Sequence, residues 1–257
     1  NIQLADIVGY LADDPQTSVI CLYIEEIRQA ERFEKALLRA QQQGKPVIAL
    51  KGGKTPAGAR ATQAHTGSNS LNGADYQAIF ERTGVIEVDS LSEMIRYSEF
   101  YLSGNKLSGK RIGVVSISGG AGVMLSDQLE NAGLSIGAFS DDLCTKMHPL
   151  LSVFSANQNP IDVTAALVAE PEMLQNITAA LIQSNEFDAI VIFMGLMDSI
   201  ADQLAEGVIL LEKKPGCPVF LIWMGGQKQL LSTISKSGVM VFEEIPELVS
   251  LLSKLAD

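Results

Sequence analysis

The sequence predicts an α/β protein made of two doubly wound units, each with a parallel sheet between helices. Short apolar runs rich in β-branched residues alternate with amphipathic stretches along the 257 residues. A polar linker at residues 103–109 interrupts this alternation, so we expect domains at residues 1–104 and 105–257. An internal repeat across the linker is the third observation, and it indicates that both domains share one architecture.

Composition restricts the class of protein. The chain is 47% hydrophobic and carries a net charge of −11, so most of its surface would repel a nucleic acid. Its three cysteines, Cys21, Cys144 and Cys217, lie far apart without C-x-x-C spacing, which is typical of reduced thiols in a cytoplasmic protein. The sequence shows neither a run of about 18 apolar residues nor a signal peptide. We therefore expect a cytoplasmic protein without a membrane segment.

In the first domain, periodicity predicts helices and strands in alternation. The predicted helices are residues 4–11, 28–43, 70–82 and 91–102, and the predicted strands are residues 18–24, 46–50 and 85–88. Residues 50–73 are rich in Gly, Ala, Ser and Thr and poor in large apolar residues, so we expect a long loop there.

The second domain shows the same alternation. Predicted strands are residues 111–116, 189–194, 219–223 and 239–242, and predicted helices are residues 123–131, 173–184, 200–212, 228–235 and 246–255. Turns are expected at residues 118–122 and 159–162.

The internal repeat pairs the middle of the first domain with the end of the second. Residues 45–50 and the following Gly-Gly resemble residues 217–222 and their following Gly-Gly, and residues 84–88 resemble residues 238–242. The strand and glycine turn at residues 111–122 have no counterpart before residue 1. We therefore expect the first domain to lack its opening strand and the chain to be a fragment of a longer protein.

The predicted loop at residues 50–73 is a candidate anion site. It contains His65, one of two histidines in the chain. The region from residue 35 to residue 74 has no carboxylate and six basic residues: Lys35, Arg39, Lys45, Lys51, Lys54 and Arg60. A cationic segment in an acidic chain favours phosphate binding. The alternative is a surface loop with a solvated histidine. The other histidine, His148, precedes a proline and apolar residues and is predicted to be structural.

The second candidate site is the glycine-rich turn after the strand at residues 111–116. It reads Ser118, Gly119, Gly120, Ala121, Gly122 and leads into a helix. This order places main-chain N–H groups and the positive end of a helix dipole at one point, as in phosphate sites. The alternative is that the glycines only allow tight packing of the helix on the sheet.

Six motifs in one order then resemble those of NDP-forming acyl-CoA synthetases, the superfamily of ADP-forming acetate–CoA ligase and succinyl-CoA synthetase. They lie at residues 14–25, 52–55, 58–61, 65–68, 118–122 and 159–162, and the similarity spans nearly the whole chain. The resemblance implies two flavodoxin-like, succinyl-CoA synthetase-like domains, the first without its opening strand. It also implies a preceding CoA-binding domain and an ATP-grasp domain on the same or a partner chain.

The resemblance implies a role for particular residues. His65 would be the transiently phosphorylated histidine and Glu25 the carboxylate that orients it. The implied phosphate-binding residues are Gly67, Ser68, Ser118, Gly119, Gly120, Ala121 and Gly122. A free imidazole titrates at about pH 6.5, so at neutral pH one ring nitrogen can attack phosphorus while a carboxylate holds the other. No metal-ligand cluster is expected.

The implied activity is that of an acid–CoA ligase, which interconverts acyl-CoA, NDP and phosphate with acid, CoA and NTP through an acyl phosphate and phospho-His65. CoA and ADP or ATP with Mg²⁺ would be substrates of the full-length enzyme, the isolated chain would be inactive, and assembly as a homodimer stays open. One alternative is a protein lysine acetyltransferase or regulatory relative built on the same domains. Another is a non-catalytic module that binds a CoA ester or a nucleotide.

Overall fold

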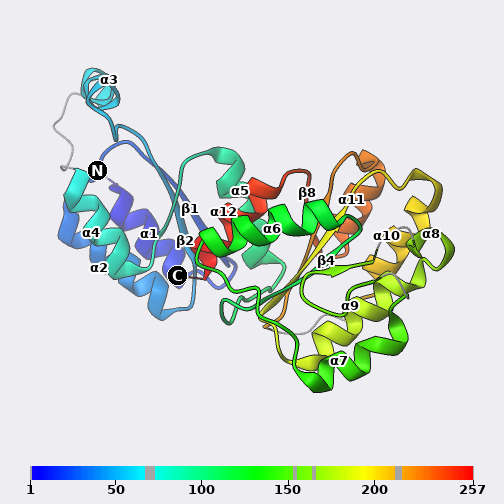
Figure 1. The fold of residues 1–257 in the computed structure, drawn as a ribbon. Helices are drawn as coiled ribbons and strands as arrows, with labels where there is room; N and C mark the ends of the chain where they lie inside the picture. The colour runs from blue at the N-terminus through cyan, green and yellow to red at the C-terminus, as the bar shows by residue number, and fades with distance from the viewer. Residues whose placement is uncertain (1, 67–72, 153–154, 164–165, 212–215, 257) are drawn as a thin grey trace. The chain divides into compact units, whose positions relative to one another are not determined.

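The computed structural model describes residues 2–66, 73–152, 155–163, 166–211 and 216–256 (Figure 1). The chain divides into two compact units, Asn1–Gly104 and Asn105–Asp257, each with its own sheet. Both sheets are parallel, which confirms the predicted α/β class.

The first unit has a three-stranded sheet in the order β1-β2-β3. Its strands are β1 (Ile20–Ile24), β2 (Val47–Lys51) and β3 (Ile86–Val88), and its helices are α1 (Leu4–Asp13), α2 (Ala30–Gln42), α3 (Pro56–Thr66), α4 (Gly73–Thr83) and α5 (Leu91–Leu102). Helices α1 and α2 pack together and cover one face of β1, where Val8, Phe33 and Leu37 are almost fully buried. This burial follows the amphipathic spacing of both helices.

The second unit has a five-stranded sheet in the order β5-β4-β6-β7-β8. Its strands are β4 (Ile112–Ser116), β5 (Ile161–Asp162), β6 (Ala189–Met194), β7 (Val219–Trp223) and β8 (Met240–Phe242). Its helices are α6 (Gly119–Asn131), α7 (Asp141–Met147), α8 (Ala166–Ala169), α9 (Glu172–Ser184), α10 (Ala201–Ile209), α11 (Lys228–Lys236) and α12 (Ile245–Leu255), with 3₁₀ turns at η1 (His148–Leu150) and η2 (Asp198–Ile200). All six residues of β6 are buried, as expected for a strand between two others and covered on both faces.

Two expectations need correction. The segment 50–73 is not simply a loop, because it contains α3, an Ala-rich helix that starts with Pro56 and has no apolar stripe to reveal it. The glycines of residues 118–122 do not form a turn before a helix, because α6 begins at Gly119 and Ser118 is its N-cap. In addition, the predicted turn at residues 159–162 contains the two-residue strand β5, which pairs with β4. Helices α7 and α8 were not predicted; α8 spans only 4 residues.

Candidate functional site

The site in the first unit begins where β1 and β2 end. Ile24 pairs with Lys51 in the parallel register, so both strands finish at the same sheet edge. The Gly52 N–H donates to the Ile24 carbonyl at 2.9 Å and extends this pairing by one step. Glu25, the next residue after β1, therefore lies at the carboxyl edge of the sheet, where α/β proteins place their ligands.

Helix α3 reaches this edge through small residues. The Thr55 hydroxyl accepts the Gly58 N–H at 3.1 Å and caps the helix. Gly53 has a φ of +75°, which strains any other residue, and a Cβ there would lie 2.8 Å from the Thr62 hydroxyl oxygen, so that a side chain at Gly53 would force this hydroxyl to move. A Cβ on Gly58 would lie 3.2 Å from the Cα of Gly53. These two glycines let α3 lie against the turn that follows β2.

His65, in the last turn of α3, contacts Glu25. Its Nδ1 lies 2.9 Å from the Glu25 Oε2. The His65 side chain is 76% exposed and the Glu25 side chain is 31% exposed. A carboxylate accepts but does not donate, so neutral His65 carries its proton on Nδ1 in this pair. Its Nε2 then keeps a lone pair, and the ring is open to an incoming electrophile.

Two lysines of the basic segment have partners beside this pair. Lys51 is only 6% exposed, and its ammonium donates to the main-chain carbonyls of Glu25, at 2.9 Å, and Gly52. Lys54 lies between Glu87, at 2.7 Å, and Asp89, at 2.8 Å. Desolvation lowers the pKa of Lys54, but hydrogen bonds to Asp89 and Glu87 outweigh it and raise the pKa to about 12. The sequence indicated the basic segment but not these partners.

The glycine-rich segment of the second unit forms the first turn of α6. Ser118, Gly119 and Gly120 are exposed, whereas Ala121 and Gly122 are buried. The Ser118 hydroxyl accepts the Ala121 N–H at 3.4 Å and caps the helix. A Cβ on Gly120 would meet no heavy atom within 4 Å, so the N-terminal turn is open on that side.

An acidic residue that the site prediction did not include lies at this turn. A Cβ on Gly119 would lie 2.9 Å from the Asp162 Oδ2, so the carboxylate occupies space beside the start of α6. Asn159 fixes the chain before Asp162, since its side chain accepts the Val114 N–H and donates to the Ile112 carbonyl, both at 2.9 Å. Residues 159–162 form one of the motifs that carry the family resemblance, and in the structure they place the Asp162 carboxylate beside Gly119.

The remaining candidates lie elsewhere. Gly67 and Ser68 fall outside the described residues. His148 begins η1 and is exposed. The pair of His65 and Glu25 belongs to the first unit and the Ser118–Gly122 segment to the second, and the structure describes each unit by itself.

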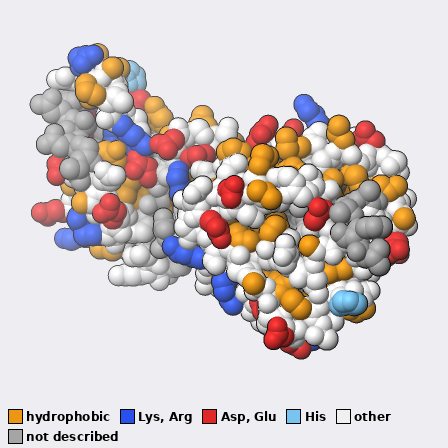
Figure 2. All heavy atoms as spheres, viewed as in Figure 1, with side chains coloured by type: hydrophobic (Ala, Val, Ile, Leu, Met, Phe, Trp, Pro, Cys, Tyr) orange, Lys and Arg blue, Asp and Glu red, His pale blue; other side chains and the backbone are white. Residues whose placement is uncertain are grey.

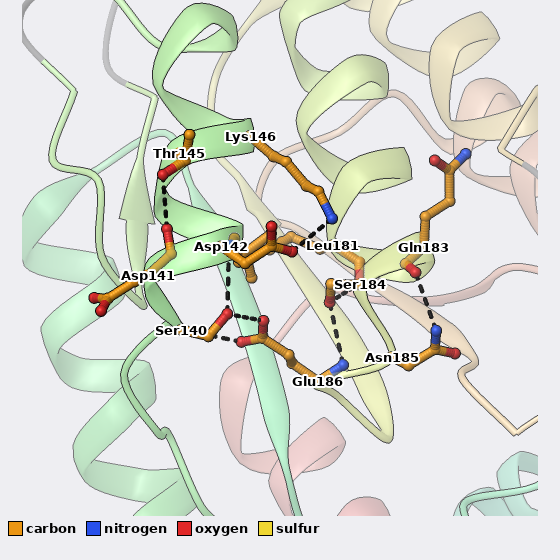
Figure 3. A network of polar contacts seen from close by, with 11 residues as sticks. Ser140, Asp141, Asp142, Thr145, Lys146, Leu181, Gln183, Ser184, Asn185 and Glu186 are labelled. Carbon is orange, nitrogen blue, oxygen red and sulfur yellow. Dashed lines mark hydrogen bonds and ion pairs between the residues drawn. The ribbon is translucent and has the colours of Figure 1, made fainter.

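A polar network in the second unit has a structural role (Figure 3). Ser140 caps α7 by accepting the Leu143 N–H at 3.1 Å, and its own N–H and hydroxyl donate to the Glu186 carboxylate. Asp142 pairs with Lys146 one turn later, at 2.6 Å. These carboxylates serve capping and pairing, and in the part of the chain that the structure describes no His, Cys, Asp and Glu cluster could hold a metal ion.

The visible surface has charges of both signs interspersed with apolar side chains (Figure 2). None of the described helices is both long and apolar enough to cross a membrane.

Comparisons with known proteins agree with this architecture. Residues 1–101 match the family model of the "Succinyl-CoA ligase like flavodoxin domain". The alpha subunit of acetate–CoA ligase (ADP-forming) II from Pyrococcus furiosus is 29% identical over 95% of this chain and 54% of its own length. The alpha subunit of form I from the same organism is 25% identical over 99% of this chain and 55% of its own length.

A solved structure shows the same fold. The dinucleotide-forming acetyl-coenzyme A synthetase 1 of Ca. Korarchaeum cryptofilum, in complex with phosphate and ADP, superposes with a TM-score of 0.84 at 23% identity, over 99% of this chain and 56% of that one. The chain thus spans about half the length of each of these three relatives. Residues 1–101 therefore carry a succinyl-CoA ligase-like flavodoxin domain, and over nearly all of its length the chain is similar to alpha subunits of ADP-forming acetate–CoA ligases.

Proposed function

We propose that this chain is the part of an ADP-forming acyl-CoA synthetase that carries the phosphoryl group between the acyl site and the nucleotide site. The observation that carries the proposal is the contact of the His65 Nδ1 with the Glu25 Oε2 at 2.9 Å, on a ring that is 76% exposed. An imidazole with one nitrogen held by a carboxylate and the other open is an activated nucleophile.

In the proposed reaction, the His65 Nε2 attacks the phosphorus of an acyl phosphate. An N–P bond forms, the P–O bond to the acyl group breaks, and the acid leaves as its carboxylate. A terminal oxygen of NDP then attacks the same phosphorus, the N–P bond breaks, and NTP leaves. Glu25 stabilises the positive charge that the ring acquires when Nε2 is bonded to phosphorus.

The Ser118–Gly122 segment is the proposed second contact of the phosphoryl group. Phosphorylation adds nearly two negative charges to the ring, and a helix N-terminus offers about half a positive charge together with free N–H groups. Gly67 and Ser68, which follow His65 in the chain, are proposed to contribute the same kind of contact. The carboxylate of Asp162 lies beside Gly119 and adds a negative charge at the N-terminus of α6. This charge weakens the attraction of the helix N-terminus for a phosphoryl group.

The activity also needs partners that the described residues do not provide. We propose a CoA-binding domain and an ATP-grasp domain or subunit, with CoA, acyl-CoA, phosphate and Mg²⁺–nucleotide as substrates and the cytoplasm as the compartment that supplies them. The relatives designated as alpha subunits support a partner polypeptide. Their designation as acetate–CoA ligases favours a ligase over the acetyltransferase or a non-catalytic binding module.

Phospho-labelling tests the proposal in the protein purified from its source cells with the subunits that copurify. Incubation with acyl-CoA and labelled phosphate should label this chain with an acid-labile, base-stable bond. His65→Asn should abolish the label, whereas His148→Asn, a change at the exposed second histidine, should retain it. Equal labelling of the His65→Asn protein would reject His65 as the carrier.

A further inference from the structure

The charged group buried at the site is the ammonium of Lys51. Lys51 is the last residue of β2 and is 6% exposed, and its Nζ lies 5.4 Å from the centroid of the Tyr76 ring. Lysine is rarely buried to this degree, because desolvation of an ammonium is costly unless its donors are satisfied. Burial lowers the pKa of Lys51, while the nearby Glu87 opposes that shift. The burial of this ammonium therefore needs a structural or functional explanation.

The partners of Lys51 supply the reason. Its Nζ donates to the Glu25 carbonyl at 2.9 Å, and Glu25 is the residue whose carboxylate contacts His65. The second acceptor is the Gly52 carbonyl. The buried cation therefore joins the main chain just beyond β1 to the main chain just beyond β2.

The main chain of Glu25 is held on both sides of its Cα. The preceding carbonyl, that of Ile24, accepts the Gly52 N–H at 2.9 Å. The following carbonyl, its own, accepts the Lys51 ammonium. With both flanking peptide groups fixed, the direction of the Cα–Cβ bond is fixed, and the carboxylate is directed toward α3.

We propose that Lys51 is a positioning residue that holds Glu25 in the orientation that keeps the His65 proton on Nδ1. The relevance of this role to phosphoryl transfer rests on the proposed function, but the role itself is a property of the ground state. Lys51 acts through Glu25 and does not touch the reacting atoms.

The test is ¹⁵N NMR of the histidine side chains at alkaline pH, where both imidazoles are neutral. The chain has only two histidines, so each ring nitrogen can be assigned, and His148 in the second unit is an internal reference. In the wild type, His65 should show a protonated Nδ1 and a bare Nε2. Glu25→Ala, which removes the acceptor, should move these shifts toward the other tautomer.

Lys51→Met should move the His65 shifts at least halfway from the wild type toward Glu25→Ala. Lys54→Met is the matched control, because Lys54 is in the same segment but pairs with Glu87 and Asp89 and not with Glu25. Its His65 shifts should stay at the wild-type values, and the His148 shifts should be unchanged throughout. Wild-type His65 shifts in a folded Lys51→Met protein would overturn the proposal.

Should Lys51→Met fail to fold, Lys51→Gln gives the same test, since it keeps a polar group at the buried position and removes the charge and the reach to Glu25. Wild-type shifts in that variant would equally overturn the proposal. The spectra need no phosphoryl transfer, so a shifted tautomer with no phospho-labelling of the wild type would reject the proposed function alone. If both hold, Lys51→Met should slow labelling of His65, by a factor no larger than that of Glu25→Ala, because Lys51→Met keeps the Glu25 carboxylate.

Discussion

The pair of strands β1 and β2 in the first unit has the same parallel arrangement as β6 and β7 in the second, but equivalent residues differ in burial. The register that pairs Ile20 with Val47 in the first unit pairs Ile190 with Val219 in the second. Tyr23 is 62% exposed on β1, whereas its counterpart Phe193 on β6 is 5% exposed. The strand β4 pairs with β6 on the side away from β7, while β1 is at the edge of its described sheet. Burial of the same position thus depends on the neighbouring elements.

The helices above these sheets show the same contrast. Leu91 at the start of α5 is 63% exposed, whereas Ile245 at the equivalent position of α12 is 4% exposed. Helix α12 contacts α6 and the sheet in the second unit. Within the described part of the first unit, α5 has no counterpart of α6 beside it.

The contrast extends to the two candidate sites. Helix α6 is fixed to its unit by Ala121, Gly122, Leu125 and Leu129, all buried. No described side chain of α3 is buried, and the contacts of the helix include the close approach of Gly53 to Gly58 and the bond of His65 to Glu25. His65 is therefore on the less tightly packed helix, and loose packing is typical of segments that move during function.

The largest effect expected from this contrast is on stability. Phe193→Ala should lower the free energy of unfolding of the second unit by about 3–5 kcal/mol, because it leaves a cavity in a packed core. Tyr23→Ala at the equivalent exposed position should change the stability of the first unit by about 0.5 kcal/mol or less. Urea unfolding followed by Trp223 fluorescence reports the second unit, since this is the only tryptophan and is 1% exposed. Circular dichroism reports the unfolding of both units. Equal losses of stability in Phe193→Ala and Tyr23→Ala would contradict the comparison.

A smaller effect concerns one ion pair in each unit. Arg111 donates to Asp188 through its side chain, at 2.8 Å and 3.0 Å, and these bonds lower the pKa of Asp188. Asp188→Asn should cost about 1.5–3 kcal/mol at neutral pH. A lowered carboxyl pKa stabilises above the unfolded value of about 3.9, so the difference should vanish as the pH falls through the folded pKa.

The matched change in the first unit is Asp13→Asn. Asp13 pairs with Arg39 at 2.6 Å, but the two side chains are 46% and 58% exposed. The expected loss is about 1 kcal/mol or less at any pH. The measurement is the free energy of unfolding of both variants as the pH is lowered. A larger or more pH-dependent loss in Asp13→Asn than in Asp188→Asn would contradict the comparison.

The smallest effect is on anion affinity at α6. Gly120→Asp places a carboxylate at the open side of the first turn, where nothing lies within 4 Å of the new Cβ. Affinity for inorganic phosphate should fall by about two- to fivefold, in line with a helix-dipole contribution. Gly9→Asp in α1, also with open space around the Cβ, adds the same charge in the first unit and should have no effect. Equal affinity in the two variants would remove α6 from the proposed site.

The sequence predicted four of the five described strands of the second unit closely, because continuous β-branched runs such as Ala189–Met194 leave little ambiguity. It missed β5, which has only two residues. It missed α3, since a helix with little buried surface has no apolar period. Loop composition and the basic segment indicated His65, but Glu25 was indicated as its partner only through the family resemblance, because 40 residues separate the two in the chain. The buried contacts of Lys51 could not be predicted, since a lysine in a basic segment has the same sequence signal whether it is solvated or buried.

The most direct test of the account is turnover by the His65→Asn enzyme. With acyl-CoA, NDP and phosphate as substrates, the protein purified with its partner subunits should form NTP at a rate lower by about a thousandfold or more, because loss of a covalent carrier removes the route between the two sites. His148→Asn should keep the wild-type rate. Wild-type turnover in the His65→Asn enzyme would contradict the account and leave His65 as a solvated side chain at the end of α3.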